Sequence, residues 1–249
     1  MKTKKYIIIG PIILIAVWAL VAQLELIDKF FLPGPLTTIN KLVQLIISGA
    51  ILGDLFSTLE RVVLAFLIAL IVGLPLGLFL GRTEKIYRSI EFIIDFFRST
   101  PATALFPLFL LIFGITDNSK IAVAAFAAML LIIFNTAYGV MHAKKSRVLA
   151  AQIMGATKAQ IFRWILFWES LPQTFIGLRS AVSLSLVIII VTEMFIGTTS
   201  GLGRRIIDSQ ITYEIPTMYA VILLAGIVGY LLNLLFLSIE KRFLHWSGK

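Results

Sequence analysis

The sequence predicts an all-α membrane protein with six transmembrane helices and with both termini in the cytoplasm. Of its 249 residues, 59% are hydrophobic and 14% are charged, a balance far outside that of soluble globular domains. The apolar residues gather in six long runs, and Lys and Arg are unequally distributed among the segments between the runs. The composition and the runs predict a helical chain embedded in a bilayer, and the charge distribution predicts its orientation.

Each expected span is an apolar run close to the roughly 20 residues that a helix needs to cross a bilayer core. The runs are residues 6–24, 58–80, 99–116, 121–141, 174–197 and 217–239. The first run follows Lys2, Lys4 and Lys5 and could be a signal peptide. It is, however, longer than a signal-peptide core of roughly 7 to 15 residues, and no small-residue cleavage site follows it. The third run is interrupted by Pro101 and Pro107, which neighbouring helices can accommodate.

The distribution of Lys and Arg places both termini in the cytoplasm. With an inside amino terminus, the cytoplasmic segments carry fifteen Lys and Arg residues and the outer segments carry five, while Arg61 and Arg179 lie within the ends of spans. This excess follows the positive-inside rule. The net charge of +9 is therefore explained by topology, and no nucleic-acid partner is expected, because the basic residues form no aromatic-basic patch or finger motif.

Residue types that hold metals or nucleotides are missing from the sequence. There is no cysteine, and the two histidines, His142 and His245, are far apart, so neither a thiolate site nor a histidine cluster is expected. Neither a Gly-x-x-x-x-Gly-Lys-Ser/Thr loop nor a kinase-type glycine loop is present. We therefore expect no cofactor in this chain and no catalytic residues.

The cytoplasmic loop of residues 142–173 contains a segment that is too polar to span a membrane. Ser146 is expected to cap a first helix of about eight residues, and Gly155 suits the left-handed position that ends it. Thr157 and Gln160 form a capping-box pattern at the start of a second helix. The loop is thus predicted to be a pair of short helices.

The first of these helices is too short to persist alone in water, so it must pack against something. Ala150, Ala151 and Gly155 would let a second backbone approach closely, as when a helix lies in the groove of a partner protein. A helix resting on lipid headgroups is the alternative. Pro172 is expected to end or kink the second helix before the membrane.

Glu193 is the one carboxylate deep in an apolar run, IIIVTEMFIG, where an unpaired charge is expensive. Glu193 has either a helix-capping or subunit-packing role, in which it is hydrogen-bonded to hydroxyls or backbone, or it contacts the transported solute. An ionised Glu193 would repel an anion, so an anionic solute would favour the structural role. Further candidates for the translocation pathway or its gate are Thr192, Arg179, Asn135 and Ser183. For these, helix packing and, for Arg179, snorkelling to headgroups are the alternatives.

Two other features concern contacts between surfaces. Small residues at every fourth position make a groove along the second span that permits close helix contact: Ala65, Ala69, Gly73, Gly77 and Gly81. The outward-facing segments 198–217 and 25–57 are candidates to meet an external protein, with Arg204, Arg205 and Asp208 as the docking charges. Solvated loop charge is the alternative for these three.

Residues 150–172 resemble the EAA loop of ABC importer permeases, whose pattern is Glu-Ala-Ala, three residues, Gly, and a later Leu-Pro. Ala150, Ala151, Gly155 and Leu171-Pro172 match, whereas Leu149 replaces the glutamate and Phe167-Trp168 replaces a first Leu-Pro. An ordered set of further motifs is similar to permeases of the nitrate, sulfonate and taurine importer group. They are LPGP at 32–35, STLERV at 57–62, GLPLGLFLG at 73–81, FGITDNSKI at 113–121, NTAYGV at 135–140 and TEMFIGTTSGLG at 192–203.

The resemblance implies a type I ABC importer permease fold as a single transmembrane domain over residues 1–249, in a bacterial inner membrane. It implies a second permease copy in a homodimer, a cytoplasmic ATPase dimer that holds ATP and Mg, and a periplasmic or lipid-anchored substrate-binding protein. The coupling helix that contacts the ATPase would lie in the loop 142–173. Its contact residues would be Ala150, Ala151, Met154, Gly155, Ala156 and Thr157.

Two other classes of membrane protein are alternatives to an importer permease. A rhomboid-like protease needs a Gly-x-Ser-Gly nucleophile, but residues 198–201 read Thr-Thr-Ser-Gly, and no His-Glu-x-x-His motif is present. A channel or an ion-driven secondary transporter would need several intramembrane charges and an inverted repeat. Only one such charge is clear, and no repeat is convincing.

Overall fold

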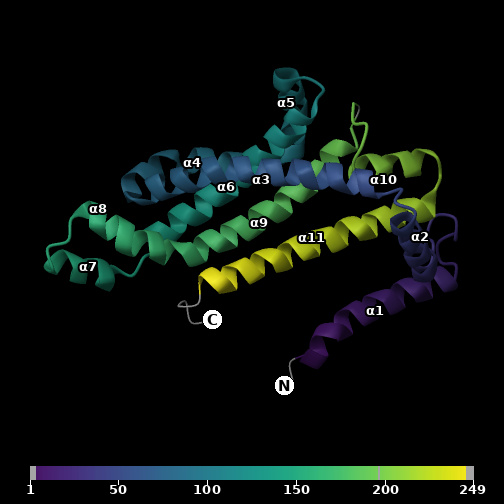
Figure 1. Ribbon diagram of the computed structural model, residues 1–249, viewed down its shortest axis with the longest axis horizontal. Coiled ribbons are helices and arrows are strands. Elements are labelled where there is room, and N and C mark those ends of the chain that lie inside the picture. Colours follow the sequence, from purple (N-terminus) through teal and green to yellow (C-terminus); the bar gives the residue numbers. More distant parts are fainter. Residues whose placement is uncertain (1–3, 196, 245–249) are drawn as a thin grey trace.

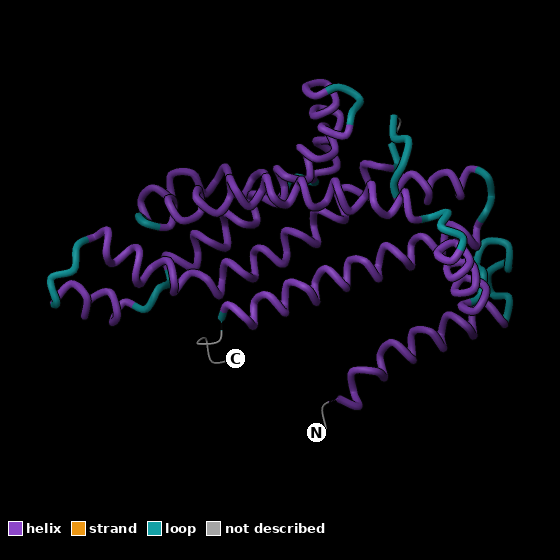
Figure 2. Tube along the Cα trace, in the orientation of Figure 1, coloured by secondary structure: helices purple, strands orange, loops and turns teal. Residues whose placement is uncertain are grey.

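The computed structural model describes residues 4–195 and 197–244, and every regular element in these ranges is helical (Figures 1 and 2). Lys2, Ile196, His245 and Lys249 lie outside the described residues. The elements are α1 (Lys4–Gln23), α2 (Pro35–Ile47), α3 (Leu52–Gly81), α4 (Glu84–Ser99), η1 (Ala102–Leu105), α5 (Phe106–Phe113), α6 (Asp117–Met141), α7 (Lys145–Ile153), α8 (Lys158–Ile161), η2 (Phe162–Leu166), α9 (Phe167–Glu193), α10 (Leu202–Ile211) and α11 (Ile215–Phe243).

Four helical stretches within the described chain are long and apolar enough to cross a membrane. They are α3, α6, the continuous stretch Lys158–Glu193 and α11, and they contain the expected second, fourth, fifth and sixth spans up to Glu193. The expected first span is also helical, as α1, but its described apolar part, Ile9–Gln23, is shorter than a full span. The prediction of a helical membrane protein is therefore confirmed.

The expected third span, residues 99–116, is wrong as a single helix. The chain instead forms α4 and the η1–α5 pair, which meet at an angle of 89° (Figure 1). The cause lies at Pro101: Thr100 before it is extended, with φ −76° and ψ 127°, because the proline ring disfavours helical geometry in the preceding residue. The helical part also begins earlier than expected, at Glu84, inside what was predicted to be a loop.

The core of the bundle is the contact of α3 and α9 with α6. The small-residue groove of α3 makes a close helix contact, as predicted, and its partner is α6: a Cβ at Gly77 would lie 2.7 Å from Thr136 Cβ, and one at Gly81 would lie 2.8 Å from the carbonyl oxygen of Ala137. On the other side of α6, a Cβ at Gly139 would lie 2.8 Å from the carbonyl oxygen of Ser170 in α9. The backbones are thus too close for any larger side chain, which is how helices associate in lipid.

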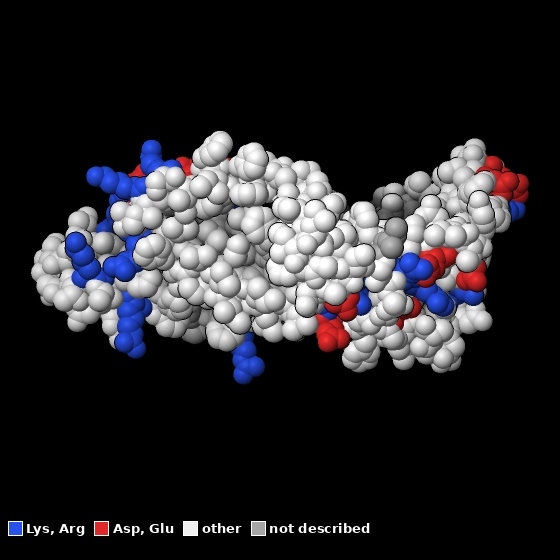
Figure 3. All heavy atoms as spheres, turned by 90° about the horizontal axis from the view of Figure 1, so that it is seen from above, with Lys and Arg blue, Asp and Glu red and all other residues white. Residues whose placement is uncertain are grey.

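The outer surface of the bundle is apolar between two charged ends. On the face drawn in Figure 3, Lys and Arg predominate at the end that carries α7 and α8, whereas the end with α2 and α10 shows acidic and basic side chains together. The surface between these ends is largely uncharged. Such a belt is what a lipid bilayer covers, because the hydrocarbon region excludes charged side chains.

Candidate functional site

The α7–α8 segment lies at one end of the bundle, beyond the ends of α6 and α9 (Figure 1). Its first helix begins two residues earlier than expected: the cap position is Lys144, and Ser146 lies inside the first turn, so the prediction that Ser146 caps the helix is wrong. The cause is a contact from α9, because the Glu169 carboxylate accepts the Lys144 N–H at 3.5 Å and forms an ion pair with Arg147. This contact holds the chain where it enters α7.

The turn between α7 and α8 has the geometry that the sequence predicts. Gly155 has φ +80° and its N–H donates to the Gln152 carbonyl at 3.0 Å, while the Ala156 N–H donates to the Ala151 carbonyl at 2.9 Å. These two bonds form a complete Schellman motif. The capping box is also present: Thr157 Oγ1 accepts the Gln160 N–H, and the Gln160 side chain accepts the Thr157 N–H.

The second helix of the segment continues into the membrane helix. Pro172 was expected to end or kink this helix, and it does not end it, because α8, the π-helical turn η2 and α9 form one continuous stretch that passes through Pro172. Close packing explains the continuity: the backbone at Ser170 lies directly against Gly139 of α6, and prolines are tolerated in membrane helices held by such neighbours. α8 is therefore joined to α9 by continuous helical backbone that includes the π-helical turn η2.

The α7–α8 segment presents uncovered apolar side chains at its tip. Ile153 is 86% exposed and Met154 is 80% exposed, and Ala150, Gly155 and Thr157 are exposed as well. Ala151 is buried within the chain and Ala156 is half-buried. The predicted contact residues thus divide into a free face and a smaller set that packs against the chain itself.

Glu193 lies in a buried cluster at the opposite end of the bundle. Its carboxylate oxygen Oε1 accepts from Arg61 Nη1 at 2.6 Å, Thr58 Oγ1 lies within 3.0 Å of both oxygens, and Oε2 accepts the Gly203 N–H at 3.0 Å. Glu193 has no exposed surface, and Arg61 is 5% exposed. The carboxylate is therefore fully engaged by its own chain.

Arg61 extends this cluster to two further segments. Its guanidinium donates to the Ser200 carbonyl at 2.7 Å and pairs with Asp117 at 3.0 Å. Glycines allow the close fit, since a Cβ at Gly201 would lie 2.4 Å from the Glu193 carboxyl carbon. Arg61 was not predicted to be the partner of Glu193, although its position at the end of an apolar run was a signal.

The other residues predicted for a pathway bond to separate partners within the chain. Asn135 accepts from Gln173 Nε2 at 2.9 Å, and Thr192 Oγ1 donates to the Ile189 carbonyl at 3.0 Å. Ser183 Oγ donates to the Arg179 carbonyl, and the Arg179 guanidinium lies 3.7 Å from Glu240 of α11. The structure does not bring these side chains together with Glu193 into one site.

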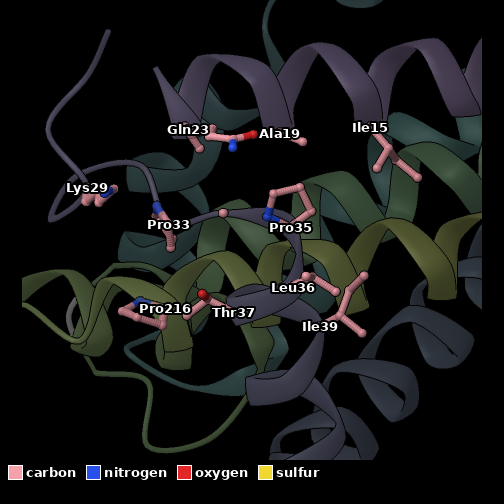
Figure 4. A pocket seen from close by; sticks show the side chains of 12 residues that line it. Ile15, Ala19, Gln23, Lys29, Pro33, Pro35, Leu36, Thr37, Ile39 and Pro216 are labelled. Carbon is pink, nitrogen blue, oxygen red and sulfur yellow. The ribbon is translucent and has the colours of Figure 1, made fainter. Parts of the chain in front are cut away.

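The residues predicted to dock an external protein lie on α10, near α2 (Figure 1). Arg204 and Asp208 form a partly exposed ion pair at 2.8 Å. Arg205 is half-buried. Beside this region, a cavity of about 550 Å³ lies between α1 and residues 29–39, and its lining is mostly apolar (Figure 4).

The family model described as "Binding-protein-dependent transport system inner membrane component" matches residues 73–245. The chain belongs to this family. It is the inner-membrane, multi-pass permease component of a binding-protein-dependent ABC transport system, and it is not the ATPase of that system. Such a system implies an ATPase and a binding protein as partners. Because the chain belongs to this family, the protease and the secondary-transporter hypotheses are rejected.

The relatives of this permease cover most of its length. The taurine transport system permease protein TauC of Escherichia coli (strain K12) is 28% identical over 95% of this chain and 88% of its own. A probable ABC transporter permease of Brucella abortus (strain 2308) is 30% identical over 88% and 87%. The nitrate import permease protein NrtB of Synechocystis sp. (strain ATCC 27184 / PCC 6803 / Kazusa) is 29% identical over 89% and 82%.

The fold is that of ABC importer permeases. A chain of the MetNI methionine ABC transporter in an inward-facing conformation aligns with a TM-score of 0.66 and 23% identity, covering 77% of this permease and 94% of that chain. The predicted fold family is thereby confirmed, and the described residues contain four candidate spans, or five when the bent α4–α5 pair is counted as one.

Proposed function

We propose that this permease crosses the membrane six times, with α1 as the first span and the bent α4–α5 pair as the third, and that both termini are cytoplasmic. The excess of Lys and Arg at the α7–α8 end supports this orientation under the positive-inside rule (Figure 3). The α7–α8 segment then faces the ATPase, and α10 faces the binding protein.

The observation that carries the function is the geometry of the α7–α8 segment. Two short helices, joined by a Schellman motif and a capping box, expose Ile153 and Met154 at their tip. Helices this short need a partner to cover an apolar face, and the ATPase of the system is the partner at this end. We propose that α7 is the coupling helix and that α8, η2 and α9 carry its movement into the membrane.

In the proposed cycle, two copies of the permease form the pathway for a small solute. A loaded binding protein docks on α10, where Arg204, Arg205 and Asp208 lie, and on the segment of residues 25–57. ATP and Mg bind in the ATPase dimer and close it, α7 of each copy moves, and the permease opens outward to receive the solute. Hydrolysis restores the inward-facing state.

Glu193 has a structural role in this proposal. Both of its carboxylate oxygens are bonded within the chain and neither is exposed. These bonds support a role in linking α3, α9 and the start of α10, and they argue against contact with the solute. Thr192, Asn135 and Ser183 also bond within the chain, which supports helix packing. Arg179 approaches Glu240, and we propose that this contact joins α9 to α11 near the cytoplasmic face.

Replacement of Met154 with aspartate tests the coupling contact. Met154 is 80% exposed in the chain alone, and a charge there would be buried without a partner in the groove of the ATPase. We expect Met154→Asp to weaken association with the ATPase by about 30-fold, the loss typical of an interface hot spot. The measurement is the fraction of ATPase that co-purifies with the tagged permease across a dilution series.

Ile47→Asp is the matched control, because Ile47 is 81% exposed and ends α2 at the opposite end of the bundle (Figure 1). It should leave ATPase association unchanged. If both variants retained the ATPase equally, the α7–α8 segment would not be part of the interface with the ATPase.

A further inference from the structure

The break between α4 and η1 lies at the middle of the bundle. Its neighbours are Phe126 and Leu130 from the middle of α6 and Leu184 from the middle of α9. Thr100 and Pro101 are extended there, and the chain turns by 89° (Figure 1). Non-helical backbone at membrane depth is tolerated only where it is buried in protein or lines a water-filled cavity. The break is therefore expected to be buried in protein or to line a polar cavity.

A cavity of about 310 Å³ opens at the break. Arg98, Ser99 and Thr100 contribute its polar lining, and the remaining lining residues are apolar. Among the described residues, Arg98 is the only charged side chain that lines the cavity, and no Asp or Glu lines it. Arg98 is paired with Asp95, but Asp95 does not line the cavity, so the charged residue in the lining is the cation of the pair, which favours an anion over a cation.

The guanidinium of Arg98 is held in place but retains free donors. Its Nη1 donates to Asp95, one turn earlier on α4, at 3.0 Å, and its central carbon lies 3.8 Å from the centre of the Phe134 ring. The ion pair uses one of the five N–H donors of the guanidinium. Within the described part of the chain, the Ser99 hydroxyl has no hydrogen-bond partner, while Thr100 Oγ1 donates to the Phe96 carbonyl and can still accept.

We propose that this cavity, at the α4–η1 break, is a subsite for a small oxyanion group of the transported solute. The Arg98 guanidinium binds the oxyanion, the Ser99 hydroxyl donates a second hydrogen bond, and the apolar walls hold the remainder of the solute. Planar N–H forks match carboxylate, sulfonate and nitrate oxygens in geometry as well as charge. The inference rests on the proposed transport function, because it places the subsite on the solute pathway.

The absence of native cysteine gives a direct test, since Ser99→Cys introduces the only thiol of the chain. The assembled transporter in nanodiscs is treated with a methanethiosulfonate reagent that carries a sulfonate, or with one that carries a trimethylammonium group. Each rate is divided by the rate of that reagent with free 2-mercaptoethanol. We expect the anionic reagent to react faster, and Arg98→Gln to lower the anion-to-cation ratio by about tenfold or more, because the substitution removes a nearby positive charge and leaves the Asp95 carboxylate without its cationic partner.

Three controls sharpen the result. Arg98→Lys keeps the charge and should keep the ratio, and Arg88→Gln, which removes an exposed charge paired with Glu84 on the same helix, should leave it unchanged. At matched ionic strength, methanesulfonate should slow the labelling of Ser99→Cys more than chloride does, and this protection should vanish with Arg98→Gln. Elution as a single species shows that each variant is assembled.

A thiol at position 99 that neither reagent reaches, a ratio unaffected by Arg98→Gln, or no protection by methanesulfonate would each overturn the subsite. Association with the ATPase and binding-protein-stimulated ATP turnover are measured on the same preparations. If these are intact and the labelling pattern fails, only the subsite is wrong. If the unsubstituted permease neither associates with an ATPase nor stimulates it, the proposed transport function itself is wrong.

Discussion

Gly155→Pro should reduce binding-protein-stimulated ATP turnover of the assembled complex to its unstimulated level, while membrane insertion remains normal. Gly155 has φ +80°, whereas proline is fixed near −65°, and proline also lacks the N–H that donates to the Gln152 carbonyl. The turn that sets the angle between α7 and α8 would therefore be lost. The measurement is ATP hydrolysis in proteoliposomes with and without loaded binding protein.

Gly155→Asn is the matched variant, because asparagine tolerates the left-handed region. The space around Gly155 is open, with nothing within 4 Å of a Cβ at this position, so a side chain alone should do no harm. We expect Gly155→Asn to keep most of the stimulation. Unchanged stimulation in Gly155→Pro would count heavily against a coupling role for this turn, and an equal loss in both variants would show that the backbone angle is not the cause.

Arg61→Met should greatly reduce the yield of folded permease. The substitution leaves the Glu193 carboxylate buried without its cationic partner, and breaking a buried ion pair from one side typically costs about 3–5 kcal/mol. It also removes the bonds from Arg61 to Ser200 and Asp117. The measurement is the midpoint of thermal unfolding in detergent, together with the fraction of protein that elutes as a single species.

The double variant Arg61→Met with Glu193→Gln should recover part of this stability, because it removes the unpaired charge as well as its partner. Arg204→Met is the control for loss of an ion pair as such, since the Arg204–Asp208 pair is partly exposed and is expected to contribute about 1 kcal/mol or less. If Arg61→Met were no more destabilised than Arg204→Met, Glu193 could not be the structural link between α3, α9 and α10 that we propose.

Local rules were sufficient where a structural feature depends on a few neighbouring residues. Gly155 adopts the left-handed conformation, and Thr157 and Gln160 form the capping box, because both features are determined by sequence positions at most three apart. The α3 groove was also predictable, since small residues at every fourth position share one face of a helix. The start of α7 was not, because the contact that holds Lys144 comes from Glu169, 25 residues later.

Long-range pairing is what the sequence could not supply. A buried glutamate indicates that a partner exists but does not identify it. Arg61 lies 132 residues before Glu193, and only the packing of α3 against α9 brings the two together. The third span was wrong for a different reason: its apolar length predicted one span in which neighbouring helices accommodate Pro101, whereas the chain bends at Thr100. Apolar length alone does not distinguish a straight span from a bent one.

The most direct test of the coupling claim is photo-crosslinking from a single thiol at position 154. Met154→Cys is labelled with a benzophenone maleimide in the assembled transporter, irradiated, and the crosslinked product is identified by mass spectrometry, with Ile47→Cys as the control at the other end of the bundle. We expect a product between this permease and the ATPase from position 154 and none from position 47. Products from position 154 that contain only lipid or other parts of the permease would contradict it.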